Sequence, residues 1–327
     1  MIDIVLCSDN NYVKPTGVLI TSIEAFNKDA ICYHIISESL SEISKANLNA
    51  CLKNKSSKIE FHIIDISVLK KCPIRENEHV SLATYFRLLL PTILPETIKK
   101  ILYLDGDILC LDSVASLFET DIENYSCAVT PDVRNDDIRI QNRLSLDKQS
   151  GYFNAGVMLI NLDWWRKFDV QNRAIQFVLE NKDLCLFHDQ DALNVLLQGT
   201  CKIISVRYNF QEHFLETLAD LLIDKKYFGD IDYAKENICF IHFTGQKKPW
   251  HIECVNPLKK LWLQVFKTTL WKREPLTYKY PKFLKRLKFN LRKWLAKIHL
   301  VSEKNIYRKL DYSALEKKYS EILKNIF

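Results

Sequence analysis

Short runs of β-branched and aliphatic residues alternate with longer amphipathic segments through most of the chain. The short runs predict strands at residues 2–7, 33–37, 58–65, 100–104, 126–130, 156–162, 202–206 and 238–243. The segments between them predict helices at residues 18–27, 40–53, 82–90, 170–181 and 188–199. Ser39 or Ser41 can cap the second of these helices, and Pro91 ends the third. Such alternation predicts an α/β fold whose mostly parallel sheet is covered on both faces.

Two carboxylates, Asp105 and Asp107, stand one residue apart directly after the apolar run 101–104. Successive side chains of a strand point to opposite faces, so the chain must bend at Gly106 for both acids to reach one ion. Mg²⁺ and Mn²⁺ take oxygen ligands and keep positions open for phosphate oxygens. The pair therefore suggests a metal bridge to a diphosphate, although a polar turn at a strand end explains the pair equally well by itself.

The composition excludes some classes of protein. With 327 residues, 47% hydrophobic and 26% charged, the chain can bury one large core and is not disordered. It has no apolar stretch of transmembrane length, and its first residues enter a strand without a signal pattern, so we expect a cytosolic protein. The ten cysteines form no CxxC pair and no Cys/His spacing suited to zinc, which predicts free, buried thiols.

The positive charge is concentrated near the C-terminus. The net charge is +6, yet residues 272–300 hold ten Lys and Arg against Glu274 alone, so the rest of the chain is net negative. This shift in composition divides the chain into an N-terminal domain at residues 1–271 and a basic, helical region at residues 272–327. This uneven charge predicts that the second region binds an anionic partner.

Within the basic region, apolar residues recur at helical spacing after Pro281. The stripe consists of Phe283, Leu284, Leu287, Leu291, Trp294, Leu295 and Ile298, and the residues between include Lys282, Lys285, Arg286, Lys288, Arg292, Lys293 and Lys297. This pattern predicts an amphipathic helix at residues 282–298 that lies on an anionic membrane surface. The alternative is a helix that packs its stripe on the catalytic domain. Nucleic-acid binding is disfavoured, because the basic residues are confined to one appended helix.

Six segments follow one another in an order that is typical of one enzyme family. They are Ile4 to Tyr12, Thr84 to Leu88, Leu102 to Asp107, Tyr152 to Val157, Asp189 to Asn194, and His242 to Gly245 with Lys248, Pro249 and Trp250. Over residues 2–255 the chain resembles the family 8 glycosyltransferases, in particular the bacterial lipopolysaccharide galactosyl- and glucosyltransferases. The resemblance implies a GT-A fold, which is a single Rossmann-like domain with a mostly parallel mixed sheet. It also implies a UDP-sugar donor, Mn²⁺ with Mg²⁺ as the alternative, and transfer with retention at the anomeric carbon.

The resemblance implies a metal site and a diphosphate site. Asp105, Asp107 and His242 match the family's metal ligands. An imidazole beside two carboxylates suits Mn²⁺ better than Mg²⁺. Lys248 resembles the lysine that reaches the diphosphate, and Gly245 would let the backbone approach a phosphate closely.

The remaining matches belong to the nucleotide sugar. Cys7, Ser8, Asp9 and Asn11 resemble the uridine-binding stretch, in which relatives often carry small residues such as Ala where Cys7 and Ser8 stand. The other implied contacts are Gly106 beside the metal ligands, Arg87 with the donor sugar or phosphate, Asn154 and Ala155 with the donor sugar, and Asp189 and Gln190 around the anomeric carbon.

The catalytic residues are expected among Asn154, Asp189 and Gln190. A two-step retaining reaction requires a carboxylate nucleophile near the reacting carbon. The amide of Gln190 is a poor nucleophile and favours a front-face route, in which the acceptor attacks from the side of the departing UDP. Asp189 is then read as a hydrogen-bond acceptor for sugar hydroxyls, with a nucleophilic role left open.

These features predict a hexosyltransferase that moves galactose or glucose from a UDP-sugar to a hydroxyl of a lipopolysaccharide core, a lipooligosaccharide or a similar glycan. We expect it at the cytoplasmic face of the inner membrane, with the acceptor read by loops at residues 132–152 and 211–232. One alternative is a metal-dependent phosphohydrolase with Asp105 as nucleophile and Asp107 as acid. Another is a non-catalytic, membrane-attached glycan-binding protein.

Overall fold

The computed structural model describes residues 1–74, 81–216, 221–279, 283–297 and 309–327. Its central sheet has seven strands in the order β3-β2-β1-β4-β7-β6-β8. The strands are β1 (Ile2–Cys7), β2 (Ile31–Ser37), β3 (Lys58–Ile63), β4 (Lys100–Leu104), β6 (Cys127–Pro131), β7 (Phe153–Asn161) and β8 (Cys201–Ile203). Only β7 runs antiparallel to its neighbours, β4 and β6, and the other pairs are parallel. The predicted α/β fold with a mostly parallel mixed sheet is confirmed.

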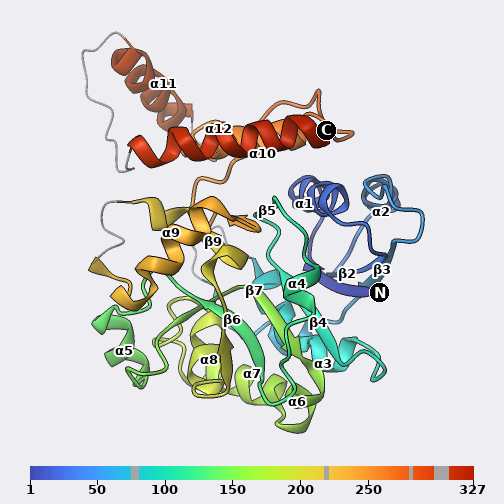
Figure 1. Cartoon of the computed structure of the whole chain (residues 1–327). Helices are drawn as coiled ribbons and strands as arrows, with labels where there is room; N and C mark the ends of the chain where they lie inside the picture. Colours follow the sequence, from blue (N-terminus) through green and yellow to red (C-terminus); the bar gives the residue numbers. More distant parts are fainter. Residues whose placement is uncertain (75–80, 217–220, 280–282, 298–308) are drawn as a thin grey trace.

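Helices cover both faces of this sheet (Figure 1). One face carries α1 (Val13–Phe26), α2 (Glu42–Asn49) and α10 (Lys259–Phe266), and the other carries η2 (Leu82–Leu89), α3 (Leu90–Ile93), α6 (Leu162–Lys167), α7 (Val170–Glu180) and α8 (Asp189–Leu196). Strand β1 shows the reason, because Ile4 and Leu6 enter one apolar cluster while Val5 enters the other. Shorter helices lie in the connections: η1 (Ser67–Leu69), α4 (Ala115–Phe118), α5 (Ile138–Leu144), η3 (Val206–Asn209), η4 (Glu212–Leu215), η6 (Lys225–Tyr227) and α9 (Phe228–Glu236).

A second sheet has three strands and carries His242. It consists of β5 (Ile108–Cys110), β10 (Phe240–His242) and β9 (Phe210–Gln211), in the order β5-β10-β9. Strand β10 is antiparallel to β5, and His242 stands opposite Ile108. Because Ile108 directly follows Asp107, this pairing brings His242 beside the carboxylate pair.

Most of the predicted helices are present, but their first and last residues differ from the predicted ones. The Ser41 side chain accepts a hydrogen bond from the backbone N–H of Ser44, so the predicted cap of α2 is confirmed. A helix is present at residues 82–90, but the prediction that Pro91 ends it is wrong. The segment is the 3₁₀ helix η2, which continues into α3 with Pro91 in its first turn. Proline fits there because the first N–H groups of a helix have no partner within it.

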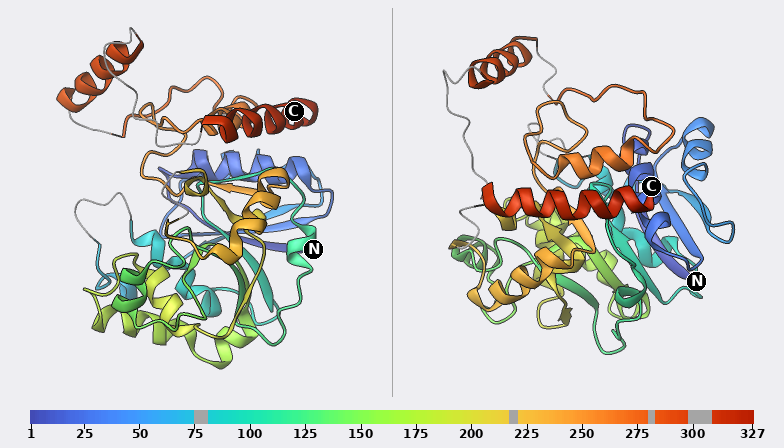
Figure 2. Two further views of the ribbon diagram at one scale, coloured as in Figure 1. Left: turned by 60° about the vertical axis from the view of Figure 1, so that its left-hand side comes forward. Right: turned by 45° about the horizontal axis from the view of Figure 1, so that its top comes forward.

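The C-terminal region contains two helices with different surroundings. Helix α12 (Lys309–Ile326) packs on α10, and Tyr312, Leu315, Tyr319 and Leu323 are buried. Helix α11 (Phe283–Lys297) stands apart from the body of the protein in every view (Figures 1 and 2). The boundary between residues 271 and 272 stays a prediction.

The apolar stripe of α11 is largely exposed. Leu287, Leu291 and Trp294 have exposed fractions of 52%, 54% and 57%. These residues lie four and three positions apart, so they share one helix face. Lys282 and Ile298, at the ends of the predicted amphipathic helix, lie outside the described residues. Leu287, Leu291 and Trp294 are therefore open to solvent, while Leu295 is partly buried.

Two further findings concern the whole described chain. None of its described helices combines the length and the apolar character needed to span a bilayer. All ten cysteines are free; Cys7 and Cys201 are partly exposed and the others are buried. The prediction of free, mostly buried thiols is confirmed.

Candidate active site

A cleft opens where strands β1 and β4 end. Its larger part measures about 580 Å³ and its smaller part about 200 Å³. Asp105, Asp107 and Lys248 line both parts, so the carboxylate pair lies where the two meet. The Asp105 side chain follows β4 directly, at the edge where ligands of parallel sheets bind.

The structure brings together the three predicted metal ligands. One ligand atom from each of Asp105, Asp107 and His242 lies within 4.8 Å of the others. The His242 Nε2 atom is 3.1 Å from Asp107 Oδ1 and 3.8 Å from Asp105 Oδ2. Two carboxylates and an imidazole at these separations match the donor set that divalent transition metals accept.

Hydrogen bonds around His242 fix which nitrogen faces the carboxylates. The Asn209 Nδ2 group donates to Asn154 Oδ1 at 2.9 Å, so Asn209 turns its oxygen toward His242. The His242 Nδ1–H group donates to that oxygen at 2.9 Å. In the neutral imidazole the Nε2 lone pair then points at two carboxylates.

The residues fit a bound cation. Asp107 Oδ1 is buried and has no hydrogen-bond partner among the described residues. A buried carboxylate oxygen without a donor is costly, and so is a lone pair aimed at it. A divalent metal satisfies both atoms at once, with the Asn209 oxygen supporting the imidazole from behind.

Two glycines make room for this arrangement. A Cβ atom on Gly156 would lie 2.2 Å from His242 Cε1 and 2.8 Å from Asp105 Oδ2. A Cβ atom on Gly106 would lie 2.9 Å from the ring of Tyr12. Gly106 therefore serves the close approach of Tyr12 in addition to the predicted bend, and Gly156 provides the space that the ligands occupy.

Lys248 closes the cleft beside the ligands. Its Nζ atom lies 2.5 Å from Asp107 Oδ2 and 2.7 Å from the carbonyl oxygen of Phe243. Burial opposes ionisation of Asp107, but the interactions with Lys248 and His242 together outweigh it and hold the pKa of this carboxyl well below its usual range. Asp107 is therefore a carboxylate at neutral pH, as a metal ligand must be.

Arg87 holds Asp105 from the other side. It is buried, and its guanidinium lies over the ring of Tyr103 at 4.4 Å. Its Nη2 atom is 3.0 Å from Asp105 Oδ1 and its Nε atom is 2.7 Å from Asp189 Oδ2. Nη1 donates to the carbonyl oxygen of Ala155. Arg87 lines the smaller cavity, so its predicted contact with the donor stays a prediction beside its observed role in orienting Asp105.

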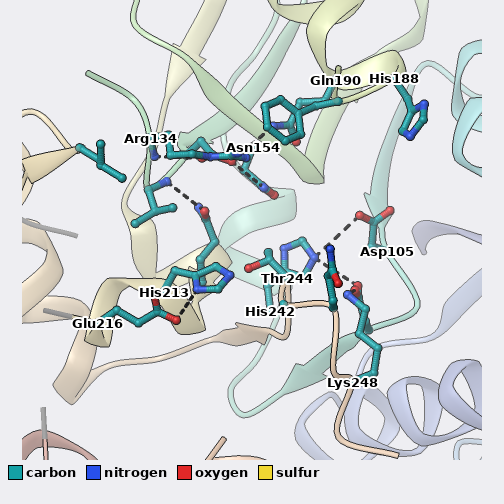
Figure 3. A pocket seen from close by; sticks show the side chains of 18 residues that line it. Asp105, Arg134, Asn154, His188, Gln190, His213, Glu216, His242, Thr244 and Lys248 are labelled. Carbon is teal, nitrogen blue, oxygen red and sulfur yellow. Dashed lines mark hydrogen bonds and ion pairs between the residues drawn. The ribbon is translucent and has the colours of Figure 1, made fainter. Parts of the chain in front are cut away.

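The wall of the larger cavity carries a carboxylate between two amides. Gln190 Oε1 accepts from the backbone N–H of Ala155 at 3.0 Å, and Gln190 Nε2 donates to Asp132 Oδ2 at 3.3 Å. Asn154 Nδ2 donates to the same oxygen at 3.1 Å. Arg134 lies beside this group along the wall (Figure 3). The amide of Gln190 is thereby fixed in one orientation at the cleft.

Comparison with known proteins decides the family. The sequence profile of the family described as "Glycosyl transferase family 8" matches residues 3–254. The chain belongs to glycosyl transferase family 8. The family resemblance stated from the sequence is therefore confirmed, and membership disfavours the phosphohydrolase alternative.

Two relatives are similar to this family 8 chain over most of their own length. "General stress protein A" of Bacillus subtilis is 29% identical over 82% of this chain and 94% of its own length. "Lipopolysaccharide 1,3-galactosyltransferase" of Salmonella typhimurium is 26% identical over 89% of this chain and 86% of its own length. Among solved structures, the galactosyltransferase LgtC in complex with donor and acceptor sugar analogs is 28% identical, with a TM-score of 0.75. It aligns over 83% of this chain and 99% of its own.

The nucleotide residues expected of a family 8 member divide into two groups. Cys7, Ser8 and Asp9 line the smaller cavity, together with Tyr12. Asn11 is exposed and is not among the residues that line either part of the cleft. Burial raises the pKa of the Cys7 thiol to about 12, so Cys7 stays a neutral thiol. Asp9 Oδ1 accepts from two backbone N–H groups at the start of α1, which fixes this carboxylate at the cavity.

Asp189 is enclosed by protein donors. Its Oδ1 atom accepts from Thr84 Oγ1 at 2.8 Å, and Arg87 pairs with Oδ2. Burial raises the pKa of Asp189, against the charge of Arg87. The backbone of His188 has φ of +54°, and the following turn presents Gln190 to the cleft. The predicted contact of Asp189 with the sugar stays a prediction, while the structure shows Asp189 holding Arg87.

Two other predicted contacts have protein partners here. The N–H of Gly245 donates to Glu212 Oε1 at 2.6 Å, and a Cβ atom on Gly245 would lie 2.3 Å from that oxygen. Gly245 therefore admits the Glu212 carboxylate, and its contact with a phosphate stays a prediction. The methyl group of Ala155 is buried in an apolar cluster, so Ala155 offers its backbone to the site.

Several site residues were not predicted from the sequence. Asp132, Asn209 and Gly156 are essential to the geometry described above, and His213 lines the larger cavity with its Nδ1 atom 2.7 Å from Glu216 Oε1. Gly156 stands inside one of the six family segments, and Asp132 begins a loop expected to read the acceptor. Nothing in the sequence pattern distinguishes Asn209 as the partner of His242.

Gly156→Ala tests the space at the metal site. The added methyl group displaces His242 or Asp105, so we expect Mn²⁺ affinity to fall at least about tenfold, as for other disturbances of ligand geometry. Isothermal titration with Mn²⁺ measures this effect. Gly229→Ala is the matched control, because a Cβ atom there meets nothing within 4 Å. Equal Mn²⁺ affinity in the two folded variants would contradict the assigned ligand set.

Proposed function

We propose that this family 8 chain transfers galactose or glucose from a UDP-sugar to a hydroxyl of a lipopolysaccharide core or similar glycan, with Mn²⁺ and with retention. The observation that carries the proposal is the ligand set Asp105, Asp107 and His242 at the junction of two cavities. Two relatives support the acceptor class. They are the Salmonella galactosyltransferase and "Lipopolysaccharide 1,2-glucosyltransferase" of Escherichia coli, which is 28% identical over 81% of this chain and 77% of its own length.

The two cavities suit the two ends of a nucleotide sugar. The uridine takes the smaller cavity, where Asp9 and Ser8 offer polar groups and Tyr12 an aromatic face. The diphosphate then lies at the junction, next to Lys248. The hexose extends into the larger cavity toward Asn154 and Gln190. An acceptor sugar can enter from the far side of the same cavity, past His213 and Arg134.

Transfer breaks the bond between the anomeric carbon and the β-phosphate oxygen, whose electron pair leaves with UDP. Mn²⁺ supplies Lewis-acid stabilisation of the charge on the departing diphosphate when it is bound. Lys248 places a second positive charge next to that diphosphate. Its ammonium exchanges Asp107 Oδ2 for phosphate oxygens of similar charge.

The new bond joins the acceptor oxygen to the same carbon, and the acceptor proton passes to the departing phosphate oxygen. Gln190 cannot supply a carboxylate nucleophile, and its amide is held between Ala155 and Asp132. Asp189 Oδ1 accepts a hydrogen bond from Thr84, and Asp189 Oδ2 forms an ion pair with Arg87. These contacts support the front-face route over a covalent glycosyl-enzyme intermediate.

Product analysis tests this function. We expect NMR of the product formed from UDP-galactose or UDP-glucose and a truncated lipopolysaccharide to show an α-linked hexose, which is retention of the donor's configuration. Asp107→Ala should lower kcat/KM at least about a thousandfold, because Lewis-acid stabilisation contributes several kcal/mol. Asp183→Ala, at an exposed aspartate outside the cleft lining, is the matched control.

Other products would overturn the proposal. A β-linked product contradicts retention. Hydrolysis of phosphate monoesters without any sugar nucleotide supports the phosphohydrolase alternative. Glycan binding with no transfer from either donor supports the non-catalytic alternative.

We also propose that α11 holds the enzyme on the anionic cytoplasmic face of the inner membrane, without crossing it. The helix carries six basic residues and no acidic one. Leu287, Leu291 and Trp294 expose an apolar face beside these charges. Each basic residue near an anionic surface contributes roughly 1 kcal/mol, and the apolar face adds to it. A lipid-anchored acceptor would then lie within reach of the cleft.

Vesicle sedimentation tests this attachment. Replacing Leu287, Leu291 and Trp294 by Ser should lower partition onto phosphatidylglycerol-containing vesicles at least about tenfold, since each large apolar side chain contributes roughly 1.5–3 kcal/mol when buried. The matched control replaces the exposed Ile43, Leu221 and Val255 by Ser. Unchanged sedimentation of the α11 variant, or equal binding to neutral vesicles, would contradict the proposal.

A further inference from the structure

A second group of metal-binding side chains lies on the edge of the central sheet formed by β1, β2 and β3. Its members occupy alternate strand positions and therefore share one face of the sheet: Asp3, Cys32, His34, Glu60 and His62. None of them belongs to the cleft lining described above. The proposed glycosyl transfer makes no use of this group.

Three side chains in the group converge on one point. His34 Nδ1 lies 3.0 Å from His62 Nε2 and 3.6 Å from Glu60 Oε2. Tetrahedral zinc with bonds of about 2.0–2.1 Å to nitrogen and oxygen holds its ligands about 3.3 Å apart. The two separations from His34 Nδ1 lie on either side of that value, and the His62 and Glu60 ligand atoms lie within 4.8 Å of each other, so the three side chains can reach one ion.

Asp3 prepares His34 as a ligand. The His34 Nε2–H group donates to Asp3 Oδ1 at 3.1 Å, which leaves the Nδ1 lone pair directed toward His62 and Glu60. A carboxylate behind a ligating histidine is the usual support of zinc sites, because it fixes the tautomer and raises the basicity of the ligand. His34 itself is 1% exposed, in the middle of the fully buried strand β2.

The open side of the group can take solvent. Glu60 and His62 are partly exposed, so a water molecule can complete the coordination. Lys58 pairs with Glu60 Oε1, which leaves Oε2 on the side of the histidines. Among the described strands, β3 forms one edge of the central sheet and pairs with β2.

We propose that His34, Glu60 and His62 bind a zinc ion, with Asp3 as the supporting carboxylate. The ion ties the edge strand β3 to β2 and is a structural site separate from the Mn²⁺ site of the cleft. Two histidines and a glutamate from two neighbouring strands form a set that zinc accepts, with water as fourth ligand.

Zinc titration of the Asp107→Asn variant tests the proposal, because this substitution removes competition from the cleft. We expect one Zn²⁺ per chain by calorimetry and by elemental analysis after gel filtration. His62→Ala and Glu60→Gln should each weaken Zn²⁺ binding at least about tenfold, and Asp3→Asn about 10–100-fold. Zn²⁺ should also raise the unfolding temperature, and the His62→Ala variant should lose this increase.

Two matched controls decide where the ion binds. His213→Ala removes a partly exposed histidine outside the group and should leave Zn²⁺ affinity unchanged. Cys32→Ser changes a group that neighbours both Asp3 and Glu60, so we expect a smaller loss of Zn²⁺ affinity than in His62→Ala. A large loss in Cys32→Ser with none in His62→Ala would place the metal on the other side and overturn the proposed ligands.

A spectroscopic measurement requires no substitution among the proposed zinc ligands. Co²⁺ bound to the Asp107→Asn protein should give the intense visible absorption of tetrahedral coordination by nitrogen and oxygen, and Zn²⁺ should displace it. Absence of stoichiometric Zn²⁺ binding, octahedral Co²⁺ alone, or unchanged binding in folded His62→Ala would each refute the proposal.

Discussion

The cleft is organised around mutual repulsion among electron-rich atoms. The lone pair of His242 Nε2 and the carboxylates of Asp105 and Asp107 face one point from three directions. Left alone, such a group costs free energy, because buried charges of one sign repel in a medium of low dielectric constant. Arg87 and Lys248 each relieve one carboxylate from outside the group. The centre can take a cation, and the proposed function ties nucleotide binding to that cation.

The fold determines which residues form this group. The central sheet delivers Asp105 at the end of β4, and the small sheet delivers His242 by pairing β10 with β5. Strand β7 supplies Gly156, whose missing side chain leaves the space that the other residues fill. Strand β7, the one antiparallel strand of the central sheet, thus contributes this space. It also contributes the amide of Asn154 to the wall of the larger cavity. The candidate metal site and the proposed sugar site are built on the same short piece of backbone.

The sequence carries part of this account and not the rest. Local patterns predict the strands, and the Asp105 and Asp107 pair after an apolar run predicts the metal. The segment at residues 82–90 shows the limit of such patterns, because its apolar spacing is compatible with both α and 3₁₀ helices and tertiary packing decides. The contacts that Asn209 makes with His242 and Asp132 with Gln190 join residues distant in the chain. The histidines of β2 and β3 show no metal spacing either, since they meet only through strand register. Helix α12 lies in the region predicted to be helical, but the mixed charges of residues 301–327 did not predict that it packs on α10.

The central claim is that a metal held by Asp105, Asp107 and His242 is needed for nucleotide binding. Calorimetric titration of the full chain with UDP, first with Mn²⁺ and then with EDTA, tests it most directly. The account predicts that UDP binds with one site per chain in Mn²⁺ and that binding is lost in EDTA. Binding of UDP with the same Kd in both conditions, or no binding of UDP in Mn²⁺, would contradict it.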